Sequence, residues 1–272
     1  MSPILARDVT RLATCWRVMR RDGVALGFTS HDRDVEVGGF RYRAAPGMMP
    51  SAVMRSDGFE PDTLDVRGAL SSQAITAGSL EEGRWDGAEL RLFLIDWSDP
   101  EAGSVPLARG AIGAVSVRGN GFEAELRGPT ALLERPVAEQ TSPECRAMLG
   151  DRRCRVDMAG RVLVTEVTAI SGEQQIATAS AAGGSNAYAS GRLRWLSGGN
   201  CGLDSAIASS SGSAIVLRDP PPRPISVGDR IELHEGCDKA LATCATRFGN
   251  AANFRGEPHL PGTDLLTRYP GG

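Results

Sequence analysis

Six cysteines are the residues of this 272-residue chain whose type and spacing suggest chemistry. Four of them form two local pairs, because eight residues separate Cys145 from Cys154 and six separate Cys237 from Cys244. A stretch of 82 residues lies between the pairs. Paired cysteines are typical metal ligands, so the pattern predicts one site that both pairs share. The alternative interpretation is that all four are small, buried apolar thiols.

The spacing within each pair also bears on which metal could bind. A structural zinc ion takes ligand pairs two to four residues apart, because Zn–S bonds of ~2.3 Å force the sulfurs close together. If residues 238–248 form a helix, Cys237 and Cys244 lie about two turns, or roughly 10 Å, apart along it. A 4Fe-4S cluster is larger and also takes four thiolates, so we expect it rather than zinc, which remains the alternative.

The other two cysteines are expected to be solitary thiols. Cys15 lies within a predicted strand, and Cys201 lies in a Gly-Asn-Cys-Gly loop. The N-terminus lacks the layout of a signal peptide, which predicts synthesis in the cytoplasm. That reducing compartment argues against a disulfide framework and favours a metal site or free thiols.

Composition indicates an ordinary globular protein rather than a disordered or membrane one, with 41% hydrophobic and 23% charged residues. Aromatic residues make up only 5%, whereas 33 glycines and recurrent Asp-Gly, Asn-Gly and Gly-Gly pairs indicate many short strands. The formal net charge of −3 provides no basic surface for binding nucleic-acid phosphates. No apolar run approaches the ~20 residues that span a bilayer.

The elements that must position the cysteines are mainly β. Residues 1–136 read as an N-terminal antiparallel β domain, with hairpins at Asp22-Gly23, Gly38-Gly39 and Asn120-Gly121. Within it, residues 72–82 suit a helix, residues 88–97 a strand, and residues 114–117 should pair with 122–126. This half contains no sharp chemical motif.

Residues 137–272 form the predicted C-terminal domain, in which residues 158–235 read as a small β-barrel inserted between the cysteine pairs. Its clearest strands are residues 162–168 and 214–217, and residues 225–233 are expected to close the barrel. Flexible connections are expected at 183–185 and 209–213, and a stiff proline-rich one at 219–224. After a short helix at 238–248, residues 249–262 form an irregular run that something else must position.

Two C-terminal segments resemble a known family. They are Gly236-Cys237-Asp238-Lys239 with Thr243-Cys244, and the run from Phe248 to Gly262 that contains Asn250, Asn253 and Arg255. Together with the segment from Cys145 to Cys154, they are similar to the baseplate hub proteins of gene-transfer-agent and siphophage-like tails. That family is related to the lambda minor tail protein L, which holds an iron–sulfur cluster with a similar paired-cysteine pattern. The resemblance covers mainly the C-terminal half.

The resemblance implies a function and a ligand set. Cys145, Cys154, Cys237 and Cys244 would hold a structural 4Fe-4S cluster in a virion protein of the tail tip. The chain would form a homotrimeric ring through its N-terminal domain and connect the distal tail protein to the central tip or fibre protein. It would neither bind nucleic acid directly nor insert into a membrane. The resemblance gives Cys201 no role, and Asn250, Asn253 and Arg255 are expected only to order the tail.

Catalysis has few candidate residues, so we expect a protein that is not an enzyme. The sequence contains no G-x-S-x-G or H-E-x-x-H motif, and its three histidines are His31, His234 and His259. His234 lies near a proposed ligand, where it could tune a cluster by hydrogen bonding. Two alternatives remain: a metal-dependent enzyme of the tail tip that acts on the cell envelope, and a metal-free binding module.

Overall fold

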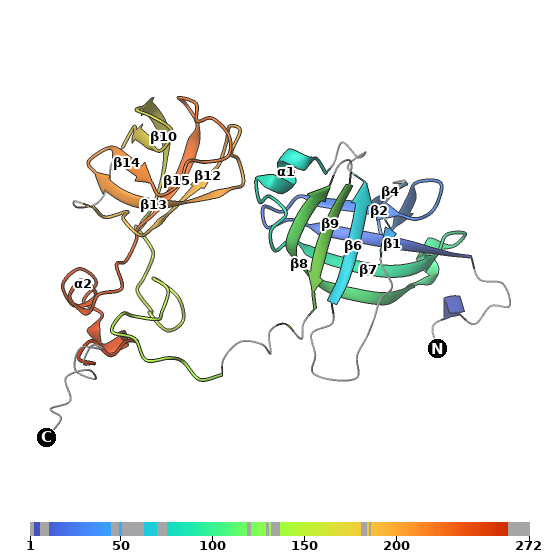
Figure 1. Cartoon of the computed structure of the whole chain (residues 1–272), viewed down its shortest axis with the longest axis horizontal. Coiled ribbons are helices and arrows are strands. Elements are labelled where there is room, and N and C mark those ends of the chain that lie inside the picture. Colours follow the sequence, from blue (N-terminus) through green and yellow to red (C-terminus); the bar gives the residue numbers. More distant parts are fainter. Residues whose placement is uncertain are drawn as a thin grey trace, which may run out of the picture. The chain divides into compact units, whose positions relative to one another are not determined.

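The computed structural model divides into two compact units, Met1–Val137 and Ala138–Gly272 (Figure 1). It describes residues 3–5, 11–44, 49–50, 63–69, 75–118, 121–128, 131, 137–180, 184 and 186–260. Both units are built mainly of strands, as the sequence predicted. Within the described residues, no helix is long and apolar enough to cross a membrane.

The N-terminal unit is a nine-stranded sheet with the order β3-β4-β2-β1-β7-β8-β9-β6-β5. Its strands are β1 (Leu12–Met19), β2 (Ala25–Thr29), β3 (Val35–Val37), β4 (Phe40–Ala44), β5 (Met49–Pro50), β6 (Thr63–Ala69), β7 (Glu89–Asp96), β8 (Ser104–Arg118) and β9 (Gly121–Arg127). Short helices accompany them: η1 (Pro3–Leu5), α1 (Ala77–Glu81) and η2 (Pro100–Ala102).

The sheet is mostly antiparallel, in agreement with the predicted antiparallel domain, and contains one parallel pair. β2 and β4 run parallel, with Phe28 opposite Arg43. The tight turn at Gly38-Gly39 makes β3 and β4 antiparallel, and β4 rather than β3 lies next to β2. The chain forms the edge strand β3 first and then turns back to place β4 between β3 and β2, so β4 runs parallel to β2.

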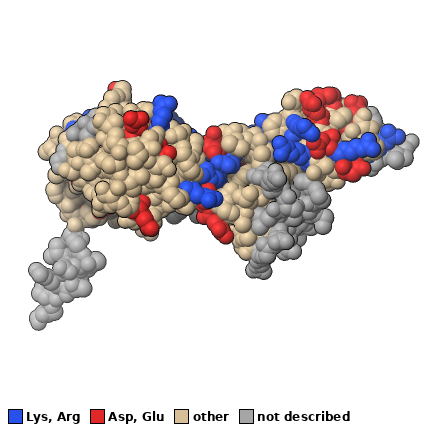
Figure 2. Space-filling model, turned by 90° about the horizontal axis from the view of Figure 1, so that it is seen from above, with Lys and Arg blue, Asp and Glu red and all other residues tan. Residues whose placement is uncertain are grey.

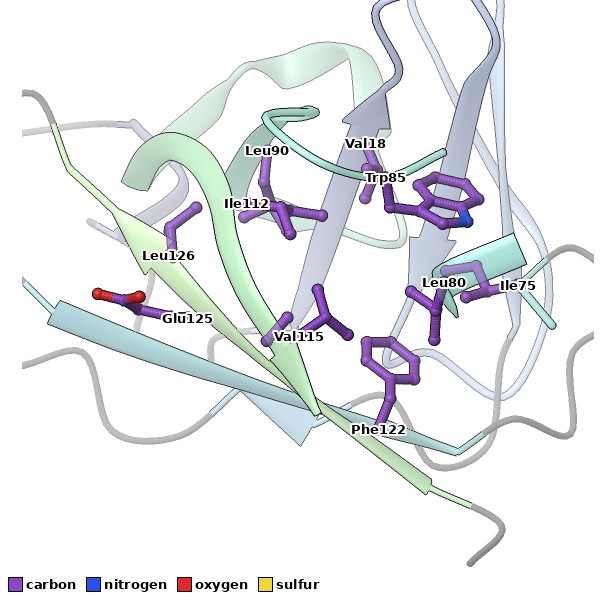
Figure 3. Close-up of a pocket in the computed structure, with 11 residues that line it drawn as sticks. Val18, Ile75, Leu80, Trp85, Leu90, Ile112, Val115, Phe122, Glu125 and Leu126 are labelled. Atoms are coloured by element: carbon purple, nitrogen blue, oxygen red, sulfur yellow. The ribbon is translucent and has the colours of Figure 1, made fainter. Parts of the chain in front are cut away.

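Alternating side chains build the main core cluster of this unit on one face of the sheet, and a smaller cluster with Cys15 and Ile95 lies on the other face. Trp16 and Val18 of β1 and Leu90 and Leu92 of β7 are buried in the main cluster together with Trp85. Figure 3 shows Trp85 with Leu80 and Ile75, from α1 and the segments beside it, lining a small apolar cavity with side chains of the sheet. Helix α1 thus covers the apolar face, which is why an isolated five-residue helix persists.

Two elements of the N-terminal unit differ in length from the prediction. Helix α1 follows a Thr76–Ser79 capping box and ends at Glu81, so it is shorter than the expected 72–82, of which 72–74 lie outside the described residues. Strand β8 has 15 residues, whereas only its end at 114–117 was predicted. Proline and glycine are unusual inside a strand, so Pro106 and the glycines hid the rest of β8 from sequence-based prediction. Register shifts in the pairing of β8 with β7 and with β9 accommodate these residues. The predicted hairpin joins β8 to β9, although residues 119–120 of its turn lie outside the described residues.

The C-terminal unit contains a closed barrel of six strands in the order β10-β11-β14-β13-β12-β15. Its strands are β10 (Val162–Ile170), β11 (Gln175–Thr178), β12 (Arg192–Trp195), β13 (Asp204–Ser211), β14 (Ala214–Leu217) and β15 (Arg230–His234). Inward side chains such as Leu193, Ile207 and Leu233 are fully buried. Helices α2 (Leu241–Thr246) and η4 (Ala251–Asn253) follow the barrel.

The serine run at 209–213 is not a flexible connection, contrary to expectation. β13 continues to Ser211 and pairs with β14, and Ser210 is buried. The Ser210 hydroxyl accepts a hydrogen bond from the Tyr188 amide at 3.0 Å, while the Ser210 amide donates to Asn186 Oδ1 at 2.9 Å. These partners compensate for the polar residue inside the barrel wall. Most of the other predicted flexible connection, 183–185, lies outside the described residues.

Candidate metal centre

All four paired cysteines line one small cavity in the C-terminal unit. Two of them precede the barrel in the sequence, and two follow it. Cys154 and Cys244 are buried, Cys145 and Cys237 are half-buried, and all four are free thiols. Apolar neighbours, among them Leu149 and Phe248, complete the wall. Two chain segments separated by the whole barrel therefore meet at a set of four thiols.

The segment that carries Cys145 and Cys154 is held in shape by Asp151. One carboxylate oxygen of Asp151 accepts hydrogen bonds from the amides of Cys154 (2.7 Å) and Arg153 (2.8 Å), and the other accepts from Met148 (2.8 Å). Burial alone would raise the pKa of Asp151, but these amide donors hold the pKa below its ordinary value. The loop thus folds around an ionised carboxylate, and Cys154 follows it at a fixed position.

Cys237 and Cys244 do not lie on one helix, which corrects the expected helix at 238–248. Helix α2 begins only at Leu241, and Lys239 before it has a left-handed backbone with φ of +67°. Asp238 fixes this turn by accepting from the Ala240 amide (3.0 Å) and the Thr243 hydroxyl (2.7 Å). The separation of two helical turns therefore does not apply, and both thiols reach the same cavity.

Backbone and side-chain hydrogen bonds join the two cysteine segments directly. The Cys145 amide donates to the carbonyl of Lys239, two residues after Cys237, at 2.9 Å. Asn250 makes the second link: its amide donates to the Cys244 carbonyl at 2.9 Å, and its side chain donates to the Cys154 carbonyl at 2.6 Å. Each cysteine of the first segment is thereby tied to the neighbourhood of one in the second.

Two of the four sulfurs accept hydrogen bonds from the irregular tail. The Arg255 amide lies 3.4 Å from Cys145 Sγ, and Asn250 Nδ2 lies 3.7 Å from Cys154 Sγ. Asn253 in turn donates to Asn250 Oδ1 at 2.7 Å, which orients the Asn250 amide. Donors of this kind stabilise a thiolate and tune a metal bound to it.

An ion pair positions the irregular segment after α2, for which the sequence showed no stabilising partner. Arg146 binds Glu257 through two hydrogen bonds of 2.6 and 2.8 Å, and the Ser142 amide donates to the same carboxylate at 2.9 Å. The Arg146 guanidinium and the Ser142 amide lower the pKa of Glu257 to about 2. Gly256 lies so close to Glu144 that a Cβ would stand 2.5 Å from its carbonyl oxygen.

Burial opposes ionisation of the Cys237 and Cys244 thiols in the absence of a bound cation. Desolvation and then the negative charges of the neighbouring cysteines raise the pKa of Cys244. Desolvation also raises the pKa of Cys237, although a hydrogen bond from the Lys239 backbone works in the opposite direction. Metal binding at this site would therefore release protons and should weaken as the pH falls.

Four thiols are a donor set that suits either a single zinc ion or a 4Fe-4S cluster. In the part of the chain that the structure describes, no group of three or more His, Cys, Asp or Glu side chains is close enough to hold one metal ion. Four thiols around a shared cavity are nevertheless the donor set of a 4Fe-4S cluster, which places its irons between more widely spaced sulfurs. The residues present fit such a cluster.

Cys15, Cys201 and His234 lie outside this site. Cys15 is buried in the N-terminal unit, where its thiol contacts the Thr29 hydroxyl at 3.6 Å. Cys201 is exposed, and its thiol donates to the Leu196 carbonyl at 3.2 Å. His234 Nε2 lies 2.6 Å from Glu232 and 3.3 Å from Arg192, so its ring is engaged on the barrel and does not line the cavity.

Asp151, Arg146 and Glu257 are the supporting residues that the spacing argument missed. Asp151 had a visible signal, because an aspartate three residues before a cysteine in a Gly-Asp-Arg-Arg-Cys turn is a frequent acceptor for backbone amides. The Arg146–Glu257 pair spans 111 residues and gave no local signal.

Comparisons with known proteins agree with this architecture. The model of a family described as "Baseplate hub protein, N-terminal attachment domain" matches residues 1–157, more than half of the chain. The chain belongs to the baseplate hub family. The resemblance to baseplate hub proteins that the sequence indicated is thus confirmed.

The hub is also similar to a solved structure and to a second family model. A chain from a structure described as "Virion of native gene transfer agent (GTA) particle" is 37% identical to the hub, with a TM-score of 0.85, and the match covers 98% of this chain and 94% of that one. This similarity confirms the expected place of the hub in a virion. A second family model, "Phage conserved hypothetical protein BR0599", matches residues 186–264. Cys145 and Cys154 fall in the first family match, and Cys237 and Cys244 in the second. No curated protein matches the chain.

Proposed function

We propose that this hub is a structural subunit that connects the distal end of the tail tube to the central tip or fibre protein, and that it is not an enzyme. Its family membership and its similarity to a chain of a gene-transfer-agent virion support this role. The N-terminal unit would attach to the tail and form a homotrimeric ring. The C-terminal unit would then present the barrel to the tip protein.

The convergence of four thiols on one cavity carries the second part of the proposal. Cys145, Cys154, Cys237 and Cys244 would bind a 4Fe-4S cluster, whose contribution is four strong metal–thiolate bonds that cross-link the chain. The residues around it prepare the site: Asp151 shapes one segment, Asp238 shapes the other, and Asn250 joins them. The two segments that precede and follow the barrel in the sequence would thereby be held together.

A structural role fits the surroundings of the cysteines better than catalysis. The charged side chains nearby bind one another: Glu235 bridges Arg161 (2.8 Å) and Arg247 (2.7 Å), and both guanidinium groups lie over the ring of Phe248. This assembly ties the end of β15 to the segment that follows α2. Such contacts fix backbone positions and leave the carboxylate occupied by its partners.

Tail assembly in cells that lack the endogenous gene tests the proposed role. Wild-type hub should restore tails that carry a tip, with the hub present at three copies per particle by quantitative mass spectrometry. Cys237→Ser should give tails that stall before the tip attaches, whereas Cys201→Ser should assemble normally. Normal tips in the complete absence of the hub would contradict the proposal, as would equal assembly with both variants.

A further inference from the structure

Three arginines stand directly opposite one another across three strands of the N-terminal unit. Arg17 of β1 pairs in register with Arg91 of β7, and Arg91 pairs with Arg109 of β8. Side chains at directly opposite positions share one face of a sheet, and neighbouring strands are about 4.8 Å apart. We call Arg17, Arg91 and Arg109 the arginine row.

The arginine row lies on the face of the sheet opposite the core around Trp16 and Trp85, next to a second, smaller buried cluster that includes Cys15 and Ile95. Leu90 and Leu92, which flank Arg91 in the sequence, point into the apolar core, so Arg91 points the other way. The side chains of Arg91 and Arg109 are 51% and 65% exposed. On the face of the molecule that Figure 2 shows, basic side chains (blue) lie beside acidic ones (red).

The positive charge of the row is incompletely balanced by its described neighbours. One carboxylate, Glu89, binds both Arg91 (2.8 Å) and Arg109 (3.0 Å). The Arg17 guanidinium lies 4.6 Å from the centre of the Phe40 ring, which holds it in place without neutralising it. Like charges directly opposite on neighbouring strands destabilise a sheet. The arrangement is therefore explained better by an added anionic group than by the stability of the isolated unit.

The surface beside the row has the shape and chemistry of a shallow groove. Arg17, Met19, Glu89 and Arg91 line it, and Met19 contributes an exposed apolar side chain. A guanidinium presents a planar fork of N–H donors that matches a carboxylate in two-point contact. An extended segment with carboxylates at alternating positions could therefore follow the row across the strands.

We propose that the arginine row is a docking surface for an acidic segment of a neighbouring virion protein. This inference rests on the proposed hub function, because an attachment unit needs a partner surface. An acidic protein segment is favoured over nucleic acid, because carboxylates at alternating positions can pass Glu89 beside the row, whereas Glu89 would repel a continuous phosphate backbone.

Binding of a fluorescein-labelled octaglutamate peptide to the full-length protein tests the chemistry. Saturable binding is expected by fluorescence anisotropy at low salt, and the triple variant Arg17→Ser, Arg91→Ser, Arg109→Ser should weaken it about 10-fold, since each exposed ion pair contributes only a few-fold. Glu89→Gln should instead tighten binding, because it removes the carboxylate that pairs with Arg91 and Arg109. That gain cannot result from misfolding. Arg41→Ser is the matched control, because exposed Arg41 is already paired with Asp34 at 2.6 Å.

Several outcomes would overturn the inference. Octaglutamate binding that is absent, or that the triple variant leaves unchanged, rules out recognition by the row. A DNA duplex of equal charge that competes better than the peptide, through the same arginines, would make the surface a phosphate site instead.

Particle assembly separates this inference from the hub function itself. If wild-type hub is missing from purified particles, the hub function fails. If wild type and the triple variant are both incorporated fully, the hub function stands and only the docking surface is wrong. The expected result is loss of the triple variant from particles while Arg41→Ser is retained.

Discussion

The side chain of Asn250 joins two cysteine segments by donating both to the carbonyl oxygen of Cys154, at 2.6 Å, and towards its sulfur, at 3.7 Å. Cys154 lies 96 residues earlier in the chain, and the Asn250 backbone is bonded to the carbonyl of Cys244. A single residue of the tail therefore holds one cysteine of each pair in place. This makes Asn250 a positioning residue for whatever the four thiols bind.

Replacing Asn250 with aspartate should weaken metal retention. The variant loses the N–H donor and places a negative charge beside the Cys154 sulfur, while Asn253 can still donate to the remaining oxygen. Loss of a hydrogen bond that orients a metal ligand typically costs about 10- to 100-fold in metal affinity, so iron should be lost about 10-fold faster in the presence of a chelator. Asn186→Asp is the matched control, because it makes the same change in the barrel and keeps the Oδ1 acceptor for Ser210. Equal rates of iron loss in both variants would show that Asn250 has no such role.

The Arg146–Glu257 pair predicts that docking of the tail depends on pH. The pKa of Glu257 is lowered to about 2 by the Arg146 guanidinium, from an ordinary value of 4.5. A lowered folded-state pKa stabilises the docked tail fully above about pH 4.5, and the stabilisation is lost as the pH falls towards 2. Thermal unfolding of wild type and Glu257→Gln should therefore differ most above about pH 4.5 and converge as the pH falls towards 2. A difference that grows on acidification would contradict this assignment.

Gly256 should not tolerate a methyl group. A Cβ there would stand 2.5 Å from the Glu144 carbonyl oxygen, so Gly256→Ala must push the tail away from the Cys145 segment. Overpacking of this kind costs about 1–3 kcal/mol in the free energy of unfolding. Chemical denaturation of the C-terminal unit measures the loss. Gly184→Ala is the control, because a Cβ at Gly184 meets no atom within 4 Å; equal stability of the two variants would refute the proposed contact.

The six thiols should differ in reactivity. Cys201 is exposed and should react first with a maleimide, whereas burial raises the pKa of Cys15 and should protect it until the protein unfolds. The four clustered cysteines should be protected in protein that contains a cluster and become reactive after a chelator removes the iron. Mass spectrometry of the labelled peptides resolves each site. Rapid labelling of Cys237 in iron-loaded protein would argue against its role as a ligand.

The sequence predicted the mainly β class and many strands from local signals. Paired glycines and Asp-Gly turns indicated the first hairpins, and alternating apolar residues indicated β1, β7, β10, β14 and β15. Local signals failed where a distant partner determines the conformation. Ser209 to Ser211 form a strand because β14 and Asn186 satisfy their polar groups, and β8 contains Pro106 because a register shift accommodates it.

The sequence indicated which four cysteines come together, but not the residues that hold them in place. Cysteine spacing and the family resemblance singled out the four thiols, and the structure brings them to one cavity. The expected helix between Cys237 and Cys244 was wrong, because the left-handed turn at Lys239 depends on contacts of Asp238 that no periodicity reveals. The links from Lys239 to Cys145 and from Arg146 to Glu257 connect residues about 100 positions apart, which spacing alone does not show.

Iron and acid-labile sulfide per chain, measured on full-length protein purified without oxygen, test the central claim most directly. We predict brown protein with about four irons and four sulfides per chain, carried by a single cubic cluster. Cys145→Ser, Cys154→Ser, Cys237→Ser and Cys244→Ser should each lose the iron, whereas Cys15→Ser and Cys201→Ser should keep it. Colourless protein with stoichiometric zinc, or iron that survives the loss of all four paired cysteines, would contradict the account.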